Sequence, residues 1–416
     1  MDEVRVFLEI RQTTQSGLLI IRPLCADQLT GEQQRVVKRM LDCRKRHYSA
    51  ESQLKPECWP MDITLMPSSV ELKNDEHCKT INLPPEVRIV PSSCRGLQYV
   101  LGDGLHMRLL VQAGFNNTKL VPALGDILKT KKNCTFYCQS CREGVINNRT
   151  FIRVLSLPGE NWGDLVEEWC CHPNPFNDSM LRPQNGDCFL GHNYFLISSG
   201  TGPSSEIPHS ESLGATSRSS GSVLNSKANR RVICRRCKTL LGEVHSSGAT
   251  KYYFTELFVQ PSEEGFDMVP RSPFIQSVVA QCLEELSLAR STFRFSIQGT
   301  DGKIYILMWL LNSDTLLVES SGTLACSNIF TVFEHDMSSD LRPLKIQKAI
   351  KVLYHPCVKS RNKDLVDSWG SDMGVHSLTF PSKTCLELLL ILSQSNASLP
   401  PSLRWMNAFQ VAFLNM

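Results

Sequence analysis

The sequence predicts a β-rich protein of the α+β class. It has an amino-terminal β framework (residues 1–125), a four-cysteine zinc region (126–260) and a carboxy-terminal α+β region (261–416). Short apolar runs separated by turn residues dominate the first region. Two Cys-x-x-Cys pairs lie in the second. The clearest apolar periodicity of three and four residues lies in the third. A chain of 416 residues is also longer than a single core usually organises.

Strands are expected throughout the amino-terminal region, because its apolar runs are short, aliphatic or β-branched, and separated by proline or glycine. The Gly102-Asp103-Gly104 turn between two apolar runs predicts a β-hairpin. A polar stretch at about 28–58, with a helical pattern at Gln33–Arg46, has the character of a loop inserted into this framework. The expected strands are Val4–Ile10, Leu18–Arg22, Asp62–Met66, Val87–Val90, Leu97–Leu101 and Leu105–Val111.

The two Cys-x-x-Cys pairs predict one structural metal site. This spacing lets both thiolates of a pair turn toward one ion, and each pair follows an apolar, strand-like run. Four thiolates close the coordination shell of zinc, so the ion is expected to stabilise the fold and not to catalyse a reaction. Two unrelated thiol pairs are the alternative. The pattern does not decide whether Cys134, Cys170 or Cys188 joins a metal shell. The expected ligands are Cys138, Cys141, Cys234 and Cys237.

A serine-rich tract over residues 198–230 separates the two pairs. Eleven of its 33 residues are serine and few are apolar, a composition typical of a flexible loop. A zinc ion shared across the tract is still compatible with it, because the entropy of loop closure grows only logarithmically with loop length.

The carboxy-terminal region mixes helices with strands. Ser272–Arg290 is the strongest helix in the sequence, because its apolar residues, from Ile275 to Leu286, share one face. The Thr300-Asp301-Gly302 turn predicts a second hairpin. Further helices are expected at about Leu344–Leu353 and at Thr384–Ser395. The expected strands are Lys251–Gln260, Phe293–Ile297, Lys303–Leu311, Thr315–Ser320 and Phe409–Leu414.

Charge and hydropathy limit the classes of partner. The 44 basic and 41 acidic residues give a net charge of +3, which is no reason to expect nucleic acid or an anionic membrane as a partner. No apolar run approaches the ~18 residues of a membrane span, and no signal-peptide pattern is visible. Seventeen cysteines without a secretory signal indicate reduced thiols, some of them metal-bound. We therefore expect a cytoplasmic protein, with the nucleus as a second location.

The segment Trp169-Cys170-Cys171-His172-Pro173 combines soft sulfur with imidazole, a good ligand set for zinc. It has three interpretations: a second metal site, a loop that presents a thiolate to a metal on another protein, or a small packed core. Trp162 and Trp169 bracket the segment, and tryptophan is enriched at the energetic centres of interfaces.

The segment Tyr354-His355-Pro356-Cys357 is the candidate for nucleophilic chemistry. Lys351, Lys359 and Arg361 lie around it in the sequence, and positive neighbours lower the pKa of a thiol. Cys357 is therefore either a nucleophile that accepts an acyl group or a small buried residue. Cys282 and Cys385 lie within apolar helical patterns and are expected in the core. The glycine-rich phosphate loop, HExxH and GxSxG motifs are absent.

Several motifs together resemble a known family. They are TFYCQSC with VICRRCKTLLGE, LPGENWGDLVEEWCCHP, LARSTFRF at 288–295, VPSSCRGLQ at 90–98, GDGLH at 102–106 and FQVAFL at 409–414. They closely resemble the HECT-like ubiquitin-protein ligases, also called ubiquitin-conjugating-enzyme-C-binding proteins, over nearly the whole chain. The 28–58 insert and the serine-rich tract match poorly. The second cysteine pair, followed by Leu241-Gly242, is also similar to the β-tent zinc folds of Yippee and cereblon-type domains.

The resemblance implies a ligase that accepts ubiquitin from a conjugating enzyme and passes it to lysines of a substrate, with cyclin B among the substrates. By analogy with HECT enzymes, a thioester would form on Cys357. Because the chain is far shorter than a HECT domain with both lobes, direct transfer from the bound conjugating enzyme is the alternative. The expected docking surface for that enzyme is Phe258–Val279, with Phe258 and Phe274 as contacts.

The segment at 158–175 implies a second, non-catalytic function. It resembles a motif by which a partner blocks a two-zinc RNA 3′-end-processing endonuclease, the nuclease subunit of the cleavage and polyadenylation machinery. Cys171 would place a thiolate on an active-site zinc, with Trp162, Trp169 and His172 as neighbouring contacts. A thiolate that displaces the zinc-bound hydroxide removes the nucleophile of the reaction.

Overall fold

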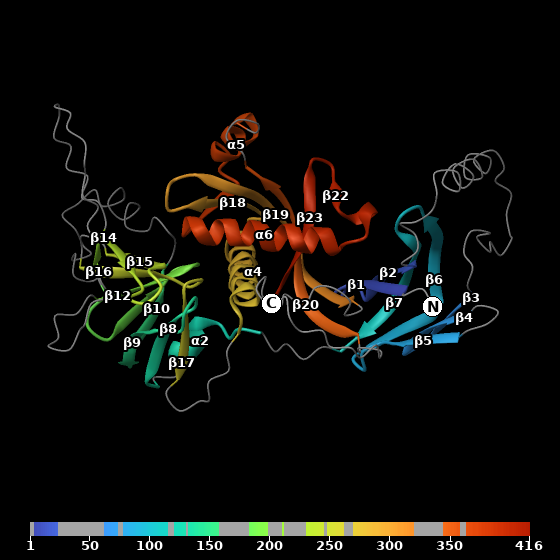
Figure 1. Ribbon diagram of the computed structural model, residues 1–416, viewed down its shortest axis with the longest axis horizontal. Coiled ribbons are helices and arrows are strands. Elements are labelled where there is room, and N and C mark those ends of the chain that lie inside the picture. The colour runs from blue at the N-terminus through green and yellow to red at the C-terminus, as the bar shows by residue number, and fades with distance from the viewer. Residues whose placement is uncertain are drawn as a thin grey trace. The chain divides into compact units, whose positions relative to one another are not determined.

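The protein forms two compact units in the computed structural model (Figure 1). Unit 1 comprises Met1–Thr118, Leu310–Leu353 and Leu392–Asn415, and unit 2 comprises Lys119–Trp309, Tyr354–Ile391 and Met416. The structure describes residues 4–23, 62–73, 78–114, 120–129, 132–157, 183–198, 210–211, 230–244, 248–261, 269–319, 344–357 and 363–416.

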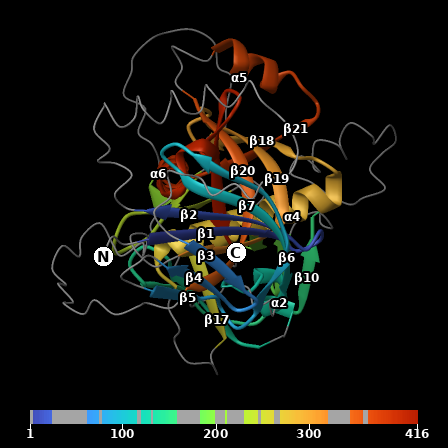
Figure 2. The same ribbon diagram turned by 90° about the vertical axis from the view of Figure 1, so that its right-hand side faces the viewer.

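Unit 1 is built on a sheet in which the strands follow the order β22-β23-β20-β19-β1-β2-β7-β6, together with a three-stranded sheet, β3-β4-β5. The neighbouring strands β1, β2 and β7 are antiparallel and lie side by side (Figure 2). A short 3-10 helix, η3 (Pro401–Leu403), precedes β22. The strands are β1 (Val4–Arg11), β2 (Ser16–Pro23), β3 (Asp62–Met66), β4 (Ser69–Lys73), β5 (Cys78–Asn82), β6 (Val87–Val100), β7 (Gly104–Ala113), β19 (Ile304–Glu319), β20 (Lys345–Pro356), β22 (Trp405–Met406) and β23 (Phe409–Asn415).

Alternation along β1 shows how the sequence produces a sheet with two buried faces. Val6, Leu8 and Ile10 are buried in one apolar cluster. Phe7 points to the other face and packs in a second cluster with Phe413. Successive side chains of a strand point to opposite faces. A strand that is apolar at both odd and even positions therefore has to be covered on both faces of the sheet.

The predicted hairpin at Gly102-Asp103-Gly104 is confirmed, because β6 and β7 pair as antiparallel neighbours on either side of it. Gly104 has a φ of 104°, and a Cβ there would collide with the Ile21 carbonyl oxygen. Asp103 is fully buried at the turn, 3.1 Å from His106 Nε2. Its carboxylate also accepts a hydrogen bond from the Ser402 backbone N–H, which ties the hairpin to η3.

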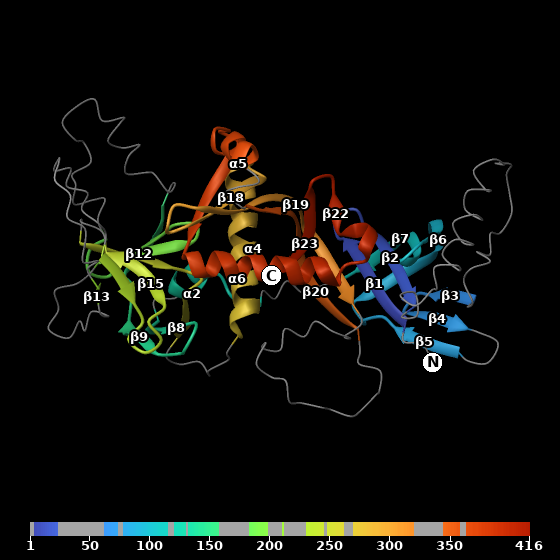
Figure 3. The same cartoon turned by 45° about the horizontal axis from the view of Figure 1, so that its top comes forward.

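Unit 2 contains a seven-stranded sheet, β10-β11-β12-β16-β15-β14-β13, and a three-stranded sheet, β17-β8-β9. Figure 3 shows β8 and β9 next to β12, β13 and β15, with α2 (Leu124–Lys129) beside them. Their apolar faces share one core, which includes Phe136, Phe195 and Leu241. The strands are β8 (Cys134–Cys138), β9 (Gly144–Arg149), β10 (Arg153–Ser156), β11 (Asp187–Leu190), β12 (Tyr194–Ser198), β13 (Ser210–Glu211), β14 (Arg230–Ile233), β15 (Leu240–Val244), β16 (Ala249–Tyr253) and β17 (Leu257–Pro261).

The rest of unit 2 contains the longest helix described, α4 (Arg271–Arg290), and two further elements, α5 (Lys363–Gly370) and α6 (Ser382–Ser398). Strand β18 (Arg294–Gly299) pairs antiparallel with the first half of β19 and parallel with β21 (Val375–Phe380). No helix among the described residues has the length and apolarity that crossing a membrane requires.

A buried ionic network fixes the start of α4. The Arg271 guanidinium donates to Glu387 on α6 at 2.8 Å and to Glu256 at 3.1 Å. The Glu256 side chain is 1% exposed, and its carboxylate also accepts a hydrogen bond from the Thr384 hydroxyl. A carboxylate buried this deeply requires such partners.

The helices predicted at Ser272–Arg290 and Thr384–Ser395 are confirmed as α4 and α6. The helix predicted at about Leu344–Leu353 is wrong, because this stretch is strand β20. Its apolar residues are buried toward both faces of the sheet, and periodicity does not separate such a strand from a buried helix. The two strands predicted at Lys303–Leu311 and Thr315–Ser320 are one continuous strand, β19.

The compact units do not follow the predicted boundaries at residues 125 and 260, because β19, β20 and α6 each contribute residues to both units. The predicted insert at 28–58 lies outside the described residues. Most of the serine-rich tract does so as well. Within it, the structure describes β13, which pairs antiparallel with β14.

Candidate functional site

Each Cys-x-x-Cys pair forms a tight turn at the end of a strand, and the two turns share one backbone geometry. The N–H of Arg142 donates to the Cys138 carbonyl at 2.8 Å, and the N–H of Lys238 donates to the Cys234 carbonyl at 3.0 Å. Both donors have a left-handed backbone, with φ of 68° at Arg142 and 60° at Lys238. Nothing in the sequence indicated these two positions, because non-glycine residues seldom adopt this conformation.

The two turns bring all four predicted thiols together. Their sulfur atoms lie within 4.8 Å of one another. The contacts between the turns are 3.6 Å for Cys138–Cys237 and 3.5 Å for Cys141–Cys234. A tetrahedral zinc ion with Zn–S bonds of about 2.3 Å would separate its sulfur ligands by about 3.8 Å. The donor set and its spacing therefore fit one tetrahedral zinc ion.

The surroundings of the sulfur atoms favour thiolates held by a cation. Burial raises the pKa of Cys138, and backbone N–H groups of Cys141 and Ser140 offset only part of that rise. Burial also raises the pKa of Cys237, but hydrogen bonds with Thr239 and the neighbouring thiols lower it overall, to about 7. A bound divalent ion would stabilise all four sulfur atoms as thiolates and neutralise half of their total negative charge.

The first cysteine turn also supports the strand beside it. Cys138 lies opposite Leu257 in the pairing of β8 with β17. Gln139, the residue after Cys138, donates its backbone N–H to the Glu256 carbonyl at 2.9 Å and its side-chain amide to the Val269 carbonyl at 3.1 Å. The turn is thus bonded to the residues that precede β17 and α4. No sequence signal indicated this function for Gln139.

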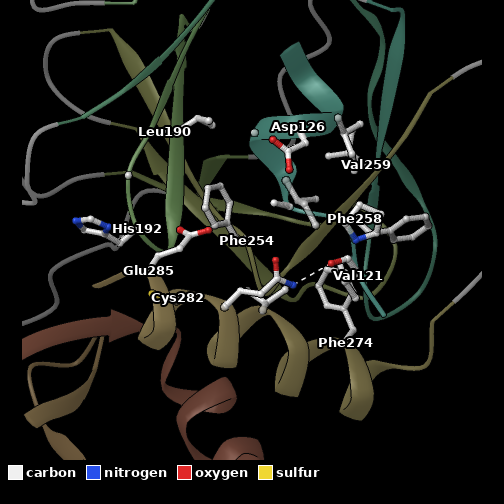
Figure 4. Close-up of a pocket in the computed structure, with 18 of the residues that line it drawn as sticks. Val121, Asp126, Leu190, His192, Phe254, Phe258, Val259, Phe274, Cys282 and Glu285 are labelled. Carbon is white, nitrogen blue, oxygen red and sulfur yellow. Dashed lines mark hydrogen bonds between the residues drawn. The ribbon is translucent and has the colours of Figure 1, made fainter. Parts of the chain in front are cut away.

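An apolar pocket of about 1000 Å³ lies next to this support. Its walls come from residues 120–127, from β17 and from one face of α4 (Figure 4). Phe258 and Phe274, predicted as contacts for a conjugating enzyme, both line it, as does Val278. Phe258 stacks on Tyr137 with ring centroids 5.2 Å apart, and Phe274 is 4% exposed. Docking at these residues stays a prediction, but the fold places them in one cavity.

Hydrogen bonds hold the pocket wall in place. The side-chain amide of Gln281 on α4 donates to the Val121 carbonyl at 2.9 Å, drawn as the dashed line in Figure 4, and lies 3.1 Å from the Ser277 hydroxyl. Together with the Arg271 network at the start of α4, these bonds define the wall before any ligand arrives.

A pair of histidines lies at one side of the pocket. His192 lines the cavity, and its ring makes an edge contact with that of His376, with centroids 6.0 Å apart. Among the described residues, the Nε2 atoms of both rings are buried without a hydrogen-bond partner. Arg290 Nη1 lies 3.5 Å from His376 Nδ1, an arrangement that requires an unprotonated Nδ1. Burial, then the Arg290 charge, lowers the pKa of His376 to about 4.

We expect acid to destabilise the protein through His376. As the pH falls through about 6.5, His376 becomes protonated in the unfolded chain, whereas in the folded chain it stays neutral until about pH 4. The contribution of neutral His376 to the free energy of unfolding is therefore fully present above pH 6.5 and is lost between pH 6.5 and 4. Melting temperatures measured across this range should fall more steeply for the wild type than for His376→Gln. Parallel curves for the two proteins would show that His376 does not titrate in this way.

Cys357 lies at the end of β20 and is half-buried. Its N–H donates to the Tyr305 carbonyl at 2.8 Å, and its thiol lies 3.8 Å from the His355 carbonyl oxygen. Burial raises its pKa to about 11, with a partial offset from the Leu307 backbone. This direction is opposite to the predicted lowering, and Lys359 and Arg361, two of the expected causes of that lowering, lie outside the described residues. The Lys351 ammonium, another expected cause, binds Glu9 at 2.8 Å instead.

The other predicted thiols fall into two groups. Cys282 and Cys385 are buried, as predicted for core residues. Cys134 and Cys188 are buried as well, and the candidate metal cluster found among the described residues does not include them. The segment with Trp162, Trp169, Cys170, Cys171 and His172 lies outside the described residues, so the endonuclease hypothesis stays a prediction.

Comparisons with known proteins identify the family. The family model described as HECT-like ubiquitin-conjugating enzyme (E2)-binding matches residues 45–411. The chain belongs to this family. It is 50% identical to the human protein named E3 ubiquitin-protein ligase E3D, over 100% of this chain and 98% of the relative. The orangutan (Pongo abelii) protein of that name shows the same identity and coverage, and the mouse protein is 48% identical, again over 100% of this chain and 98% of the relative. No solved structure matches the chain.

Membership accounts for the motifs that carried the resemblance. The family model spans the cysteine pairs, the pocket and the chain as far as residue 411 in β23, so the family pattern extends through both compact units. The family description supports a ubiquitin-conjugating enzyme as a partner.

Proposed function

We propose that this protein is a ubiquitin-protein ligase that binds a ubiquitin-conjugating enzyme and promotes transfer of ubiquitin directly from that enzyme to a lysine. The E2-binding family and the names of the relatives support ligase activity. The environment of Cys357 supports the direct route. Cyclin B is proposed as a substrate on the family resemblance alone.

The observation that carries the direct route is the half-buried position of Cys357, whose thiol lies 3.8 Å from the His355 carbonyl oxygen. Burial raises the pKa of this thiol to about 11, which favours the protonated form at neutral pH, and the thiolate is the form that attacks a thioester. The carbonyl oxygen of His355, which lies near the sulfur, stabilises the protonated thiol and not the thiolate. A half-buried thiol in this environment is poorly suited to accept ubiquitin.

In the direct route, the substrate lysine amine attacks the thioester carbonyl carbon on the conjugating enzyme. A C–N bond forms, the C–S bond breaks, and the cysteine of the conjugating enzyme leaves as a thiolate while the amine proton passes to solvent. The ligase contributes by holding the loaded enzyme and the acceptor together, and such positioning accounts for large rate effects without a covalent intermediate on the ligase.

Replacing Cys357 with alanine tests this proposal. We expect the rate at which a loaded conjugating enzyme discharges ubiquitin to lysine to stay within about twofold of wild type, because no step passes through this thiol. The variant should be checked for an unchanged melting temperature, since Cys357 is half-buried. Loss of most of the rate in a folded variant would instead assign Cys357 as the nucleophile.

We further propose that the four cysteines hold a structural zinc ion. The close approach of the four sulfur atoms supports it, and so does the backbone geometry shared by the two turns. The ion would cross-link β8 and β14, which lie far apart in the sequence and belong to different sheets. Closed four-thiolate sites stabilise a fold and leave no open position for a substrate.

A further inference from the structure

The β6–β7 hairpin of unit 1 exposes two arginines that face each other. Arg95 on β6 lies opposite Arg108 on β7 in the antiparallel ladder, and both residues are exposed. Opposite residues in such a ladder project from the same face of the sheet, with Cβ atoms about 5 Å apart, so the two like charges repel each other. The fold therefore keeps an arrangement that lowers its own stability.

Neither arginine has an acidic partner among the described residues. No ion pair or side-chain hydrogen bond of the described part of the chain involves Arg95 or Arg108. Arg11 on β1, in the same sheet, shows the more usual arrangement, because its guanidinium binds Asp314 at 2.8 Å. The donors of the two hairpin arginines are thus available to an anion from another molecule.

Irregular strand pairing sets the position of Arg95. The ladder between β6 and β7 shifts register on both sides of this residue. In the irregular segment, the Ser93 hydroxyl accepts a hydrogen bond from the Leu110 N–H at 2.7 Å and donates one to the Val90 carbonyl. Ser93 thereby replaces a bond of the ladder. Bulges of this kind redirect side chains and are frequent beside functional sites.

The surface around the two arginines is basic and has an apolar residue beside them. Along β7, Arg108, Leu110 and Gln112 alternate with buried residues and therefore share the exposed face. Arg88 lies opposite Gln112 and adds a third cation to this face. Leu110, between these two positions, is 46% exposed. We call Arg88, Arg95, Arg108 and Leu110 the hairpin face.

Protection of an open sheet edge does not account for the arginine pair. Strand β6 ends the strand order of this sheet (Figure 1), and a charged side chain on such a strand prevents it from pairing with another chain. Arg95 alone supplies that charge. Arg108 lies on β7, which has a strand on each side, so its place opposite Arg95 requires another explanation.

We infer that the hairpin face binds an acidic segment of a partner protein, with an aspartate or glutamate carboxylate between Arg95 and Arg108 and an apolar side chain on Leu110. Two neighbouring guanidinium groups can donate to one carboxylate, and hydrogen bonds between such ions are the strong ones. The bound carboxylate also offsets the repulsion between the arginines. A second copy of the chain does not fit, because two such faces repel each other. The inference is independent of the proposed function.

Binding of peptides to the full chain tests the inference. The probe is a capped, labelled peptide in which glutamates alternate with serines around a central leucine, and its binding is measured by fluorescence anisotropy at low and at physiological salt. A matched probe has glutamine in place of every glutamate. The protein variants are Arg95→Glu and Arg108→Glu. Lys73→Glu is the control, because Lys73 is exposed on β4, in the other sheet of unit 1.

We expect each arginine variant to weaken binding of the acidic peptide at least about tenfold, because repulsion replaces attraction at the contact. Lys73→Glu should bind like wild type, and the glutamine probe should not bind. Each arginine variant should also melt at a higher temperature than the wild type, because it turns a repulsive cross-strand pair into an attractive one. A purely structural role would not combine weaker binding with greater stability. Arg95→Gln serves if a charge reversal prevents folding.

Two kinds of result would overturn the inference. The first is a wild-type protein that does not bind the acidic peptide at low salt, or arginine variants that bind it as well as Lys73→Glu does. The second is tighter binding of single-stranded polyuridine than of the peptide, lost in the same arginine variants, which would assign the hairpin face to nucleic acid.

Discussion

Replacing Cys138 with alanine is expected to remove bound zinc and to unfold the two sheets around the cysteine cluster. Cys138 ends β8, and the ion would join this strand to β14 across the serine-rich tract. Structural zinc sites bind with about 10–16 kcal/mol in model peptides. Whole domains are stable by only about 5–15 kcal/mol. Loss of the ion should therefore abolish cooperative unfolding of this region, as monitored by circular dichroism, and lower the zinc content from one ion per chain to none.

Two buried cysteines of the same region provide matched controls. Cys134 is 1% exposed and Cys188 fully buried, comparable to Cys138, but neither belongs to the cluster. Cys134→Ala and Cys188→Ala should keep one zinc ion and lose only the packing energy of a small side chain. Equal stability of the Cys138 and Cys134 variants, or folded wild-type protein that contains no zinc, would contradict the metal site.

Replacing Arg271 with alanine is expected to lower the free energy of unfolding by about 3–5 kcal/mol. The change removes the cation that neutralises Glu256, whose side chain is 1% exposed, and leaves that carboxylate buried without its charge partner. It also releases α6, because Arg271 binds Glu387 there at 2.7 Å. Urea denaturation at neutral pH measures the loss.

Lys383→Ala is the control for Arg271. Lys383 also pairs with Glu387, but at 3.8 Å and with its side chain 65% exposed. Exposed ion pairs contribute little, so this variant should lose no more than about 0.5 kcal/mol. Similar losses of unfolding free energy in the two variants would contradict the claim that Arg271 stabilises the fold by neutralising the buried Glu256.

The cysteine cluster was predictable because its signal is local. Two intervening residues place both thiols of a pair in one tight turn. The apolar runs before Cys138 and Cys234 place each turn at the end of a strand. The Asp-Gly turns at Asp103 and Asp301 were equally readable, because few other dipeptides fit a tight hairpin. Local chemistry that tolerates few conformations can be recognised without the tertiary fold.

The environment of Cys357 was not predictable for the opposite reason. Neighbours in the sequence suggested an activated thiol, but Lys351 binds Glu9, which lies 342 residues away along the chain. The segment before Cys357 is a strand buried toward both faces. Burial raises the pKa of the Cys357 thiol, whereas the basic neighbours in the sequence predicted a lowered pKa. Both effects depend on contacts distant in the sequence.

The pocket was predictable only in part from the sequence. Phe258 and Phe274 were recognised as candidate contacts, yet nothing in the sequence places them in one cavity with Asp126 and Glu285. That arrangement depends on Gln139 and Gln281, which bond to backbone carbonyls far from them in sequence. Backbone acceptors leave no residue-specific pattern, so the supports of a pocket remain hidden until the fold is known.

The most direct test of the proposed function is a search for a ubiquitin adduct on this protein. The wild-type protein is incubated with a conjugating enzyme loaded with labelled ubiquitin and free lysine, and the products are separated without reducing agent. The direct route predicts faster loss of the thioester on the conjugating enzyme, with no thiol-sensitive ubiquitin band at the mass of the ligase. A band that reducing agent removes and that Cys357→Ala abolishes would contradict it, and would show that ubiquitin passes through this protein.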